Sequence, residues 1–416
     1  MAKRGDGENL LRFAVDGRVL VMKKQIYFIL LLLVTIGIQG CAKQTGLNGQ
    51  DDPLPSDQQK EVIVKTLCGV CRQNLQRVNY SKVVEIANNI VKNDIPAVRI
   101  NALKNKGSIE QVIHNINTFS QKGVKVLLEQ PMWMEMFPED YEQIPGPNFN
   151  VYKMSDIDLD RFRSFINGLL EQVALHTPED ALIGFELFNE ANWGDFNGDL
   201  QPTSDGKGEI FMLDTPLDKP SFADIYAGIG KYGKCLEITR TALDTHFPKK
   251  NVKLISTGLV SSGYWDNFHW QINRGISLVL PDMFLTILQG KHSQQQDKTN
   301  YLRFADAIGL HSYPPLEDDM VATLNNYYFD PINAVLDEPM PFWLTEWGFS
   351  RNKFENNGGE AKRLQYFRSF IQAIETTGNT ETAFLFDFDL NDGYRIWEDG
   401  ALLESGKIFQ EIKINQ

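Results

Sequence analysis

The chain has 416 residues, of which 42% are hydrophobic and 11% aromatic, a composition typical of a globular protein. Its formal net charge of −13 at pH 7 argues against nucleic acid and against an anionic polysaccharide as partner, whereas neutral sugars are compatible with it. Residues 61–416 are enough for one large α/β barrel or for two average domains.

The N-terminal segment has the pattern of an export signal. Met-Lys-Lys at residues 22–24 is followed by the almost wholly apolar stretch 26–38, which is too short to span a membrane comfortably. The stretch runs into Ile-Gln-Gly-Cys, which resembles the signal of a bacterial lipoprotein with Cys41 as the lipidated residue. An ordinary signal peptide and a membrane anchor are the alternatives. Because Met22 begins a complete signal by itself, residues 1–21 are expected to be an upstream mis-start.

We therefore expect residues 1–40 to be a signal region, made of the mis-start and a lipoprotein signal over 22–40. Residues 41–60 contain the lipidated cysteine and a stretch rich in Gly, Gln, Asp and Pro, typical of a flexible tether. This pattern predicts an exported lipoprotein held by its lipid to the outer membrane, on the periplasmic or the cell-surface face. Residues 61–416 are expected to fold as a single domain and to act as a monomer.

Short apolar strands alternate with amphipathic helices along this domain. Helical spacing is clear over 159–173, where apolar residues recur every three or four positions. Strand candidates lie at 62–67, 97–101, 124–129, 182–189, 252–257, 307–311, 342–346 and 383–387. Further helical patterns lie at 83–91, 222–243, 320–336, 361–374 and 400–412. Eight strands alternating with helices favour a (β/α)8 TIM barrel, in which 259–305 holds an irregular loop and one helix.

Polar side chains gather where these predicted strands end. In chain order the ends carry Arg99, Glu129-Gln130, Asn189-Glu190, His311-Ser312-Tyr313, Glu346, Asp387 and Asp389. The active sites of TIM barrels lie at the carboxyl ends of the strands, so this distribution supports the same fold.

Two of these residues, Glu190 and Glu346, are carboxylates at the ends of separate apolar strands. Hydrolysis of a glycosidic bond needs such a pair, because one group protonates the leaving oxygen while the other attacks the anomeric carbon or activates water. Either glutamate alone would more often be a solvent-facing residue at a strand end. The polar residues at the neighbouring strand ends favour the paired role.

The motifs together resemble clan A glycoside hydrolases, and are most similar to family 5, the cellulase and mannanase family. The family pattern Glu-x-x-Asn-Glu on strand four is matched at 186–190, and the strand-two arginine by Arg99. The His-x-Tyr after strand six is matched at 311–313, and the strand-seven glutamate with its following aromatic at 346–347. The resemblance extends from about residue 61 to the C-terminus. The histidine that the family carries after strand three and the tryptophan after strand eight have no counterpart here.

The resemblance implies a retaining β-glycosidase that acts by double displacement on a neutral glucan-type or mannan-type poly- or oligosaccharide, with neither cofactor nor metal. Glu190 would be the acid/base and need a raised pKa, and Glu346 would be the nucleophile and stay ionised. Arg99 and the Tyr313 hydroxyl are expected to hold Glu346. Asn189 is expected to donate to the sugar's 2-hydroxyl.

The roles of the remaining candidates are less specific. His311 is expected to orient Glu190 or touch the sugar, with a hydrogen-bonded core histidine as the alternative. Period-2 alternation places Glu186 and Phe188 on the side of Glu190, so that Glu186 is expected inside the barrel beside Arg99 as structural support. Tryptophans that could stack on pyranose faces, with core packing as the alternative for each, are Trp133, Trp193, Trp265, Trp270, Trp347 and Trp397.

Two other functions remain open. A non-catalytic glycan-binding surface lipoprotein would bind sugar without forming product, although decay of activity usually removes a catalytic carboxylate first. A metal-dependent barrel hydrolase would need a ligand pair such as His-x-His, and none of the six histidines is so paired. Cys68 and Cys71 have neither a second cysteine pair nor spaced histidines, so with Cys235 they favour buried thiols or a local disulfide over zinc.

Overall fold

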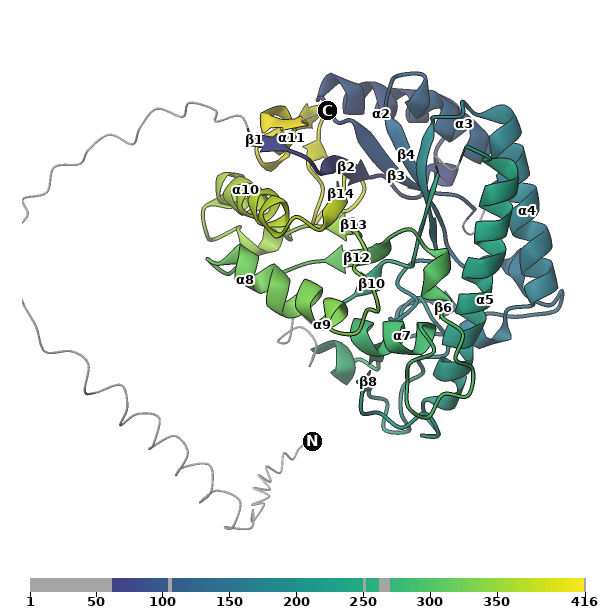
Figure 1. The fold of residues 1–416 in the computed structure, drawn as a ribbon. Coiled ribbons are helices and arrows are strands. Elements are labelled where there is room, and N and C mark those ends of the chain that lie inside the picture. Colours follow the sequence, from purple (N-terminus) through teal and green to yellow (C-terminus); the bar gives the residue numbers. More distant parts are fainter. Residues whose placement is uncertain (1–61, 104–106, 250–251, 262–269, 415–416) are drawn as a thin grey trace, which may run out of the picture. The chain divides into compact units, whose positions relative to one another are not determined.

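The computed structural model describes residues 62–103, 107–249, 252–261 and 270–414 (Figure 1). The expected signal region, Cys41 and the tether lie outside these residues. Among the helices of the described ranges, none is long and apolar enough to cross a membrane.

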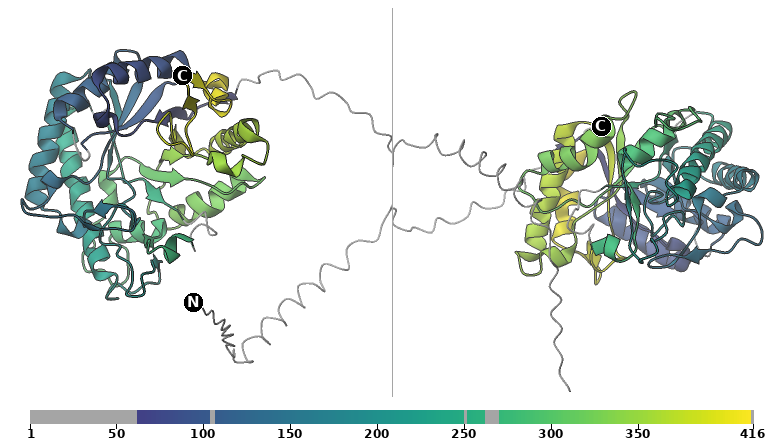
Figure 2. Two further views of the ribbon diagram at one scale, coloured as in Figure 1. Left: turned by 180° about the vertical axis from the view of Figure 1, so that it is seen from behind. Right: turned by 90° about the horizontal axis from the view of Figure 1, so that it is seen from below.

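The centre of the fold is a curved sheet of parallel strands, with helices around its outside (Figures 1 and 2). Neighbouring strands follow the order β10-β12-β13-β14-β2-β3-β4-β7-β9, and every pairing is parallel. The strands are β2 (Leu67–Cys71), β3 (Ala97–Asn101), β4 (Lys125–Gln130), β7 (Leu182–Leu187), β9 (Lys253–Ile255), β10 (Leu259–Val260), β12 (Ile308–Ser312), β13 (Phe342–Trp347) and β14 (Thr380–Leu385).

The two ends of this sheet are consecutive in the chain and close the barrel. β9 pairs with β7, and a parallel bridge joins Ile255 to Ala307, directly before β12. After a break at residues 256–258, β10 pairs with β12 with Leu259 opposite Leu310. β9 and β10 are therefore two parts of one barrel strand, and the predicted (β/α)8 barrel is confirmed, with eight strands in the described part of the chain.

Helices and short elements connect the barrel strands. The α-helices are α2 (Tyr80–Lys92), α3 (Ile109–Ser120), α4 (Leu159–His176), α5 (Ala223–His246), α7 (Pro281–Leu288), α8 (Met320–Leu324), α9 (Asp330–Asn333), α10 (Gly359–Thr377) and α11 (Ile408–Glu411). Shorter helical turns are η1 (Leu75–Arg77), η2 (Met134–Met136), η3 (Met154–Asp156), η4 (Leu302–Phe304), η5 (Asn325–Phe329), η6 (Arg351–Lys353) and η7 (Ser405–Lys407). Short strands outside the barrel are β1 (Val62–Val64), β5 (Ile144–Pro145), β6 (Asn150–Val151), β8 (Ile210–Phe211), β11 (Leu278–Val279), β15 (Trp397–Glu398), β16 (Ala401–Leu402) and β17 (Ile412–Ile414).

The first barrel strand lies later in the chain than predicted. Only Leu67 of the expected strand 62–67 belongs to it, since the barrel uses Leu67–Cys71 while Val62–Val64 pairs with β17. Both stretches are apolar, and the sequence pattern does not show which of them is enclosed on both sides. Cys68, Cys71 and Cys235 are free buried thiols, which excludes the local disulfide. Burial raises the pKa of the Cys68 thiol to about 12, so it stays protonated and unreactive.

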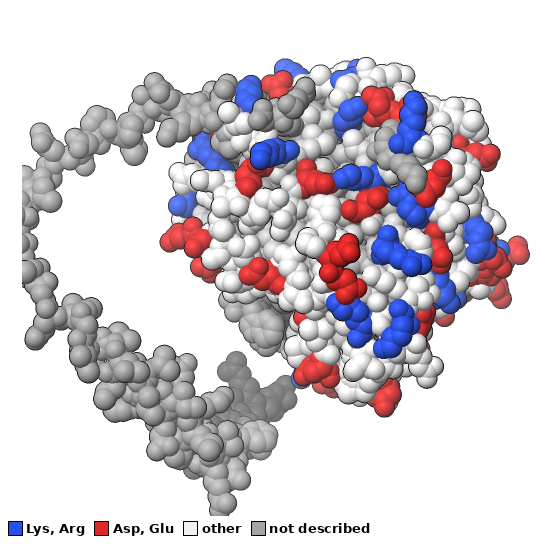
Figure 3. Space-filling model, in the orientation of Figure 1, with Lys and Arg blue, Asp and Glu red and all other residues white. Residues whose placement is uncertain are grey.

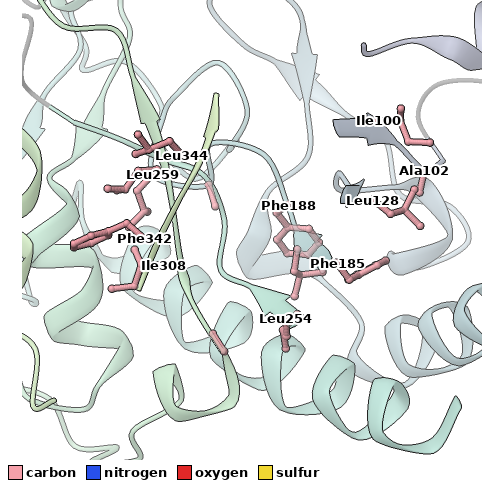
Figure 4. Close-up of a cluster of buried hydrophobic side chains, with 14 of the residues drawn as sticks. Ile100, Ala102, Leu128, Phe185, Phe188, Leu254, Leu259, Ile308, Phe342 and Leu344 are labelled. Atoms are coloured by element: carbon pink, nitrogen blue, oxygen red, sulfur yellow. The ribbon is translucent and has the colours of Figure 1, made fainter. Parts of the chain in front are cut away.

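Buried side chains form two layers. Outward-facing strand residues pack against the helices, and Figure 4 shows part of this layer, in which Phe185 of β7 lies opposite Leu254 of β9. The barrel interior is filled by a smaller group that includes Cys71, Leu127, Ile255 and Trp343. The barrel is therefore a packed core, and the polar residues lie at its mouth. On the face shown in Figure 3, acidic and basic side chains are interspersed.

Candidate active site

Arg99, fully buried at the end of β3, is the centre of a polar cluster at the carboxyl ends of the barrel strands. Its guanidinium donates to Glu186 Oε2 at 2.5 Å, to Glu346 Oε1 at 2.8 Å and to Asn189 Oδ1 at 3.0 Å. Glu186 is also fully buried and accepts a second hydrogen bond from Thr345 Oγ1 at 2.8 Å. The expected place of Glu186, inside the barrel beside Arg99, is therefore observed.

Loss of Arg99 is expected to be costly for stability. Arg99→Met would leave the Glu186 carboxylate buried without its cation, so we expect the free energy of unfolding to fall by about 3–5 kcal/mol, measured by urea denaturation. Arg163→Met, which removes an exposed pair with Asp160, is the control and should change it by less than about 1 kcal/mol. An Arg99→Met protein as stable as the control would show that the pair of Arg99 and Glu186 does not stabilise the fold.

Glu346, at the end of β13, is 4% exposed and accepts hydrogen bonds from three different side chains. Arg99 Nη1 and Gln73 Nε2 donate to Oε1 at 2.8 and 2.7 Å, and the Tyr313 hydroxyl donates to Oε2 at 2.6 Å. Burial, followed by the charge of Glu346, raises the pKa of Tyr313 well above its ordinary value, so this hydroxyl remains a donor. The contacts orient the carboxylate and favour its ionised form.

Glu190 lies across the barrel mouth in a different environment. Burial raises its pKa above the ordinary value, against the hydrogen bond with His311, which lowers it. His311 Nδ1 lies 2.7 Å from Glu190 Oε1. Burial alone lowers the pKa of His311, but the charge of Glu346 and the hydrogen bond with Glu190 outweigh burial and raise it. The two glutamates therefore lie in different environments: three donors favour the ionised form of Glu346, whereas burial raises the pKa of Glu190.

The two carboxylates are close in space. One oxygen of Glu190, one nitrogen of His311 and one oxygen of Glu346 all lie within 4.8 Å of one another. These three atoms could in principle ligate a cation. The Arg99 guanidinium beside Glu346 already neutralises that carboxylate, and the His311 nitrogen is engaged by Glu190, so the donor set suits proton transfer better.

A sharp change of backbone direction brings Glu190 into the site. β7 ends at Leu187, and both Phe188 (φ 67°) and Glu190 (φ 45°) adopt positive φ, which is uncommon away from glycine and often marks functional sites. Ala191 N donates to Thr257 Oγ1 at 3.0 Å, and Asn189 bridges to Gly258, so the break between β9 and β10 holds this turn.

Strand alternation predicted Phe188 on the same side as Glu190, and this prediction is wrong. Its ring contacts Phe162 of α4 and Tyr232 of α5, on the outer side of the barrel. Because the strand ends at Leu187, the alternation does not continue to Glu190. Glu190 reaches the barrel mouth through the turn instead.

The predicted tryptophans are placed very differently from one another. Trp347 is 1% exposed and stacks on Phe370 of α10 at 4.3 Å, so it belongs to the core, and its expected sugar contact is corrected. Successive strand residues face opposite sides, and Glu346 already takes the inner one. Trp397 is partly buried and stacks on Phe388. Trp265 lies outside the described residues.

Two cavities adjoin the site, each lined by some of its residues. Cavity A, of about 530 Å³, contains Asn189 and is lined on its other sides by Trp133, Phe149, Tyr152 and Phe196. Cavity B, of about 560 Å³, contains His311 and Tyr313 together with Trp193, Trp270, Lys353 and Tyr394. Trp133 and Trp193 therefore line cavities next to the site, where their sugar contact stays a prediction.

The sequence pattern did not reveal Gln73, Phe149 or Phe196. Gln73 follows β2, and it would have been found if the first barrel strand had been placed at Leu67–Cys71. The two phenylalanines lie in loops without a strand-end motif, so no pattern distinguishes them from core residues.

No protein-family model and no curated protein sequence matches this chain. Several solved structures are similar to it. A fungal β-1,4-galactanase has a TM-score of 0.49 and 10% identity, over 83% of this chain and 99% of its own. An endo-1,4-β-mannanase from Rhizomucor miehei has a TM-score of 0.47 and 11% identity, over 83% and 93%. A family 5 xyloglucanase from Paenibacillus pabuli has a TM-score of 0.47 and 10% identity, over 83% and 97%.

Proposed function

We propose that this chain is a retaining β-glycosidase that cleaves a neutral β-linked poly- or oligosaccharide of glucan or mannan type by double displacement. One observation carries the proposal: Glu346 is held by three donors opposite Glu190, whose pKa is raised, with carboxylate oxygens within 4.8 Å of each other. Retaining pairs lie closer together than inverting pairs, which need room for a water, so the close approach of these two oxygens supports the retaining arrangement.

In the first step, a Glu346 oxygen attacks the anomeric carbon while the bond from that carbon to the leaving oxygen breaks. Protonated Glu190 gives its proton to the leaving oxygen. In the second step, a water attacks the same carbon from the side that the leaving group vacated, and Glu190, now ionised, takes the water's proton. The bond to Glu346 breaks, and the free carboxylate again accepts hydrogen bonds from Arg99, Gln73 and Tyr313.

Two further residues act on these steps. Asn189 donates to the sugar's 2-hydroxyl, a contact that strengthens as positive charge develops on the ring. His311 keeps Glu190 oriented through both of its protonation states, because the ring nitrogen bonded to Glu190 can donate to the ionised form or accept from the protonated one.

The deciding experiment is product release by residues 42–416 from a panel of β-glucans, mannans and xylans, with the anomeric form of the first product followed by proton NMR. Early β-anomer supports retention, and early α-anomer overturns the double displacement. Binding with no product would instead favour the glycan-binding lipoprotein.

We also propose that Cys41 is lipidated and holds the enzyme to the outer membrane. The motif at its N-terminal side supports this proposal. Cys41→Ser is expected to move the protein from the membrane fraction to the soluble fraction of the cells that express it. An unchanged membrane fraction would exclude lipid attachment as the anchor.

A further inference from the structure

The hairpin of β5 and β6 carries a large apolar side chain into cavity A. Ile144 pairs with Val151, and Gly146 N donates to the Phe149 carbonyl at 3.0 Å. A Cβ at Gly146 would lie 2.6 Å from that carbonyl oxygen, so the tight turn requires glycine. Phe149 is 48% exposed and packs edge-on against Phe196, at 5.5 Å between ring centres.

A polar cluster of Asn148, Asp195 and Arg274 fixes this hairpin. Asn148 Nδ2 donates to Asp195 Oδ2 at 2.7 Å, and Arg274 Nη2 donates to Asn148 Oδ1 at 2.6 Å. Trp193 donates a hydrogen bond to Asp195, and the Arg274 guanidinium lies 4.4 Å above the ring of Trp270. Because both tryptophans line cavity B, the same cluster supports the aromatic walls of both cavities.

Residues next to the two carboxylates line each of the two cavities. Arginine can only donate, so the Asn189 oxygen faces Arg99, and Asn189 also lines cavity A. On the other side, His311 contacts Glu190 and Tyr313 contacts Glu346, and both line cavity B. Both cavities therefore adjoin the site.

We propose that cavities A and B are the two halves of one glycan-binding cleft, in which Phe149 and Phe196 bind a sugar unit away from the cleaved bond. The enzyme then cuts within long β-linked chains instead of releasing single units from an end. This inference rests on the proposed function. Each cavity has the size of an ordinary ligand site. The cluster of Asn148, Asp195 and Arg274 holds the aromatic walls in place before binding, which lowers the entropy lost on binding the glycan.

The test uses a ladder of oligosaccharides, from two to six units, of whichever polysaccharide the parent cleaves. We expect kcat/KM of the parent to rise with chain length. Phe149→Ala should lower the ratio of kcat/KM for the longest over the shortest substrate by about tenfold, the equivalent of about 1.4 kcal/mol. Tyr80→Ala is the control, because Tyr80 is also half exposed and lines neither cavity. It should keep the parent's ratio.

A second measurement guards against variants that fold poorly. Calorimetric titration of the longest oligosaccharide into Glu346→Gln, with and without Phe149→Ala, should show weaker binding in the double variant at an unchanged melting temperature. Cleavage by the parent with a length-independent kcat/KM, an unchanged ratio in Phe149→Ala, or single sugar units as the first product would overturn the inference. Failure of the parent to cleave any member of the panel would instead count against the proposed function.

Discussion

Glutamine in place of Glu346 is expected to lower kcat by about 10⁴-fold or more, since an amide cannot form the glycosyl intermediate. The change is nearly isosteric. The amide oxygen can still accept from Arg99 and Gln73, and the Tyr313 oxygen can accept from the new NH2 group. Substrate affinity should therefore change little. Initial rates and calorimetric binding on the same substrate separate the two effects.

Glu338→Gln is the matched control for this prediction, because Glu338 is exposed in the loop before β13. It should keep the parent's kcat. If Glu346→Gln kept more than a tenth of that kcat, the nucleophile would be a different residue.

Glutamine in place of Glu190 should have a different signature. We expect kcat on the natural glycan to fall by about 10²–10⁴-fold, the usual contribution of a general acid or base. For an aryl glycoside, whose leaving group needs no proton, the substitution should lower the rate of the first step much less. The parent loses activity as pH rises through the raised pKa of Glu190, because the acid form disappears. The variant should lack this alkaline limb in a pH profile of kcat/KM.

The same raised pKa makes a prediction about stability. Between the unfolded pKa of a glutamate and its higher folded value, the folded protein binds more protons than the unfolded one. The free energy of unfolding contributed by Glu190 therefore falls as pH rises through this window. Glu190→Gln removes this pH-dependent contribution. As pH rises between the two pKa values, the free energy of unfolding of the variant should therefore increase relative to that of the parent. Parallel stability curves would contradict a raised pKa.

Strand-end reasoning predicted most of the site because the fold places strand ends together. β3 has the predicted limits, and its Arg99 contacts residues of two other barrel strands and the turn after one of them. Once the barrel was recognised, the convergence of Glu190, His311 and Glu346 followed from topology, since the carboxyl ends of parallel strands meet at one mouth.

The errors have local physical causes. Side chains alternate between the two faces of a strand only as far as its last residue. Phe188 lies beyond the end of β7, whereas Trp347 is still part of β13, so one faces outward from a turn and the other from the strand itself. That limit is set by hydrogen bonds from a neighbouring strand, which no local pattern records. Phe149 depends on a hairpin held by Asp195 and Arg274, residues distant in the sequence, so its exposure could not be predicted from its neighbours.

The break in the strand formed by β9 and β10 tolerates little substitution, whereas the outer loops can vary. A side chain at Gly258 would place its Cβ 2.2 Å from His311 Nε2, and the adjacent Thr257 holds the turn that carries Glu190. The positions of Glu190 and His311 therefore depend on close contacts within the barrel wall. The hairpin that carries Phe149 is held by side chains of the outer loops. Under the proposed function, grafting a different hairpin between β4 and α4 is therefore a route to new sugar preferences that keeps Glu190 and Glu346 in place.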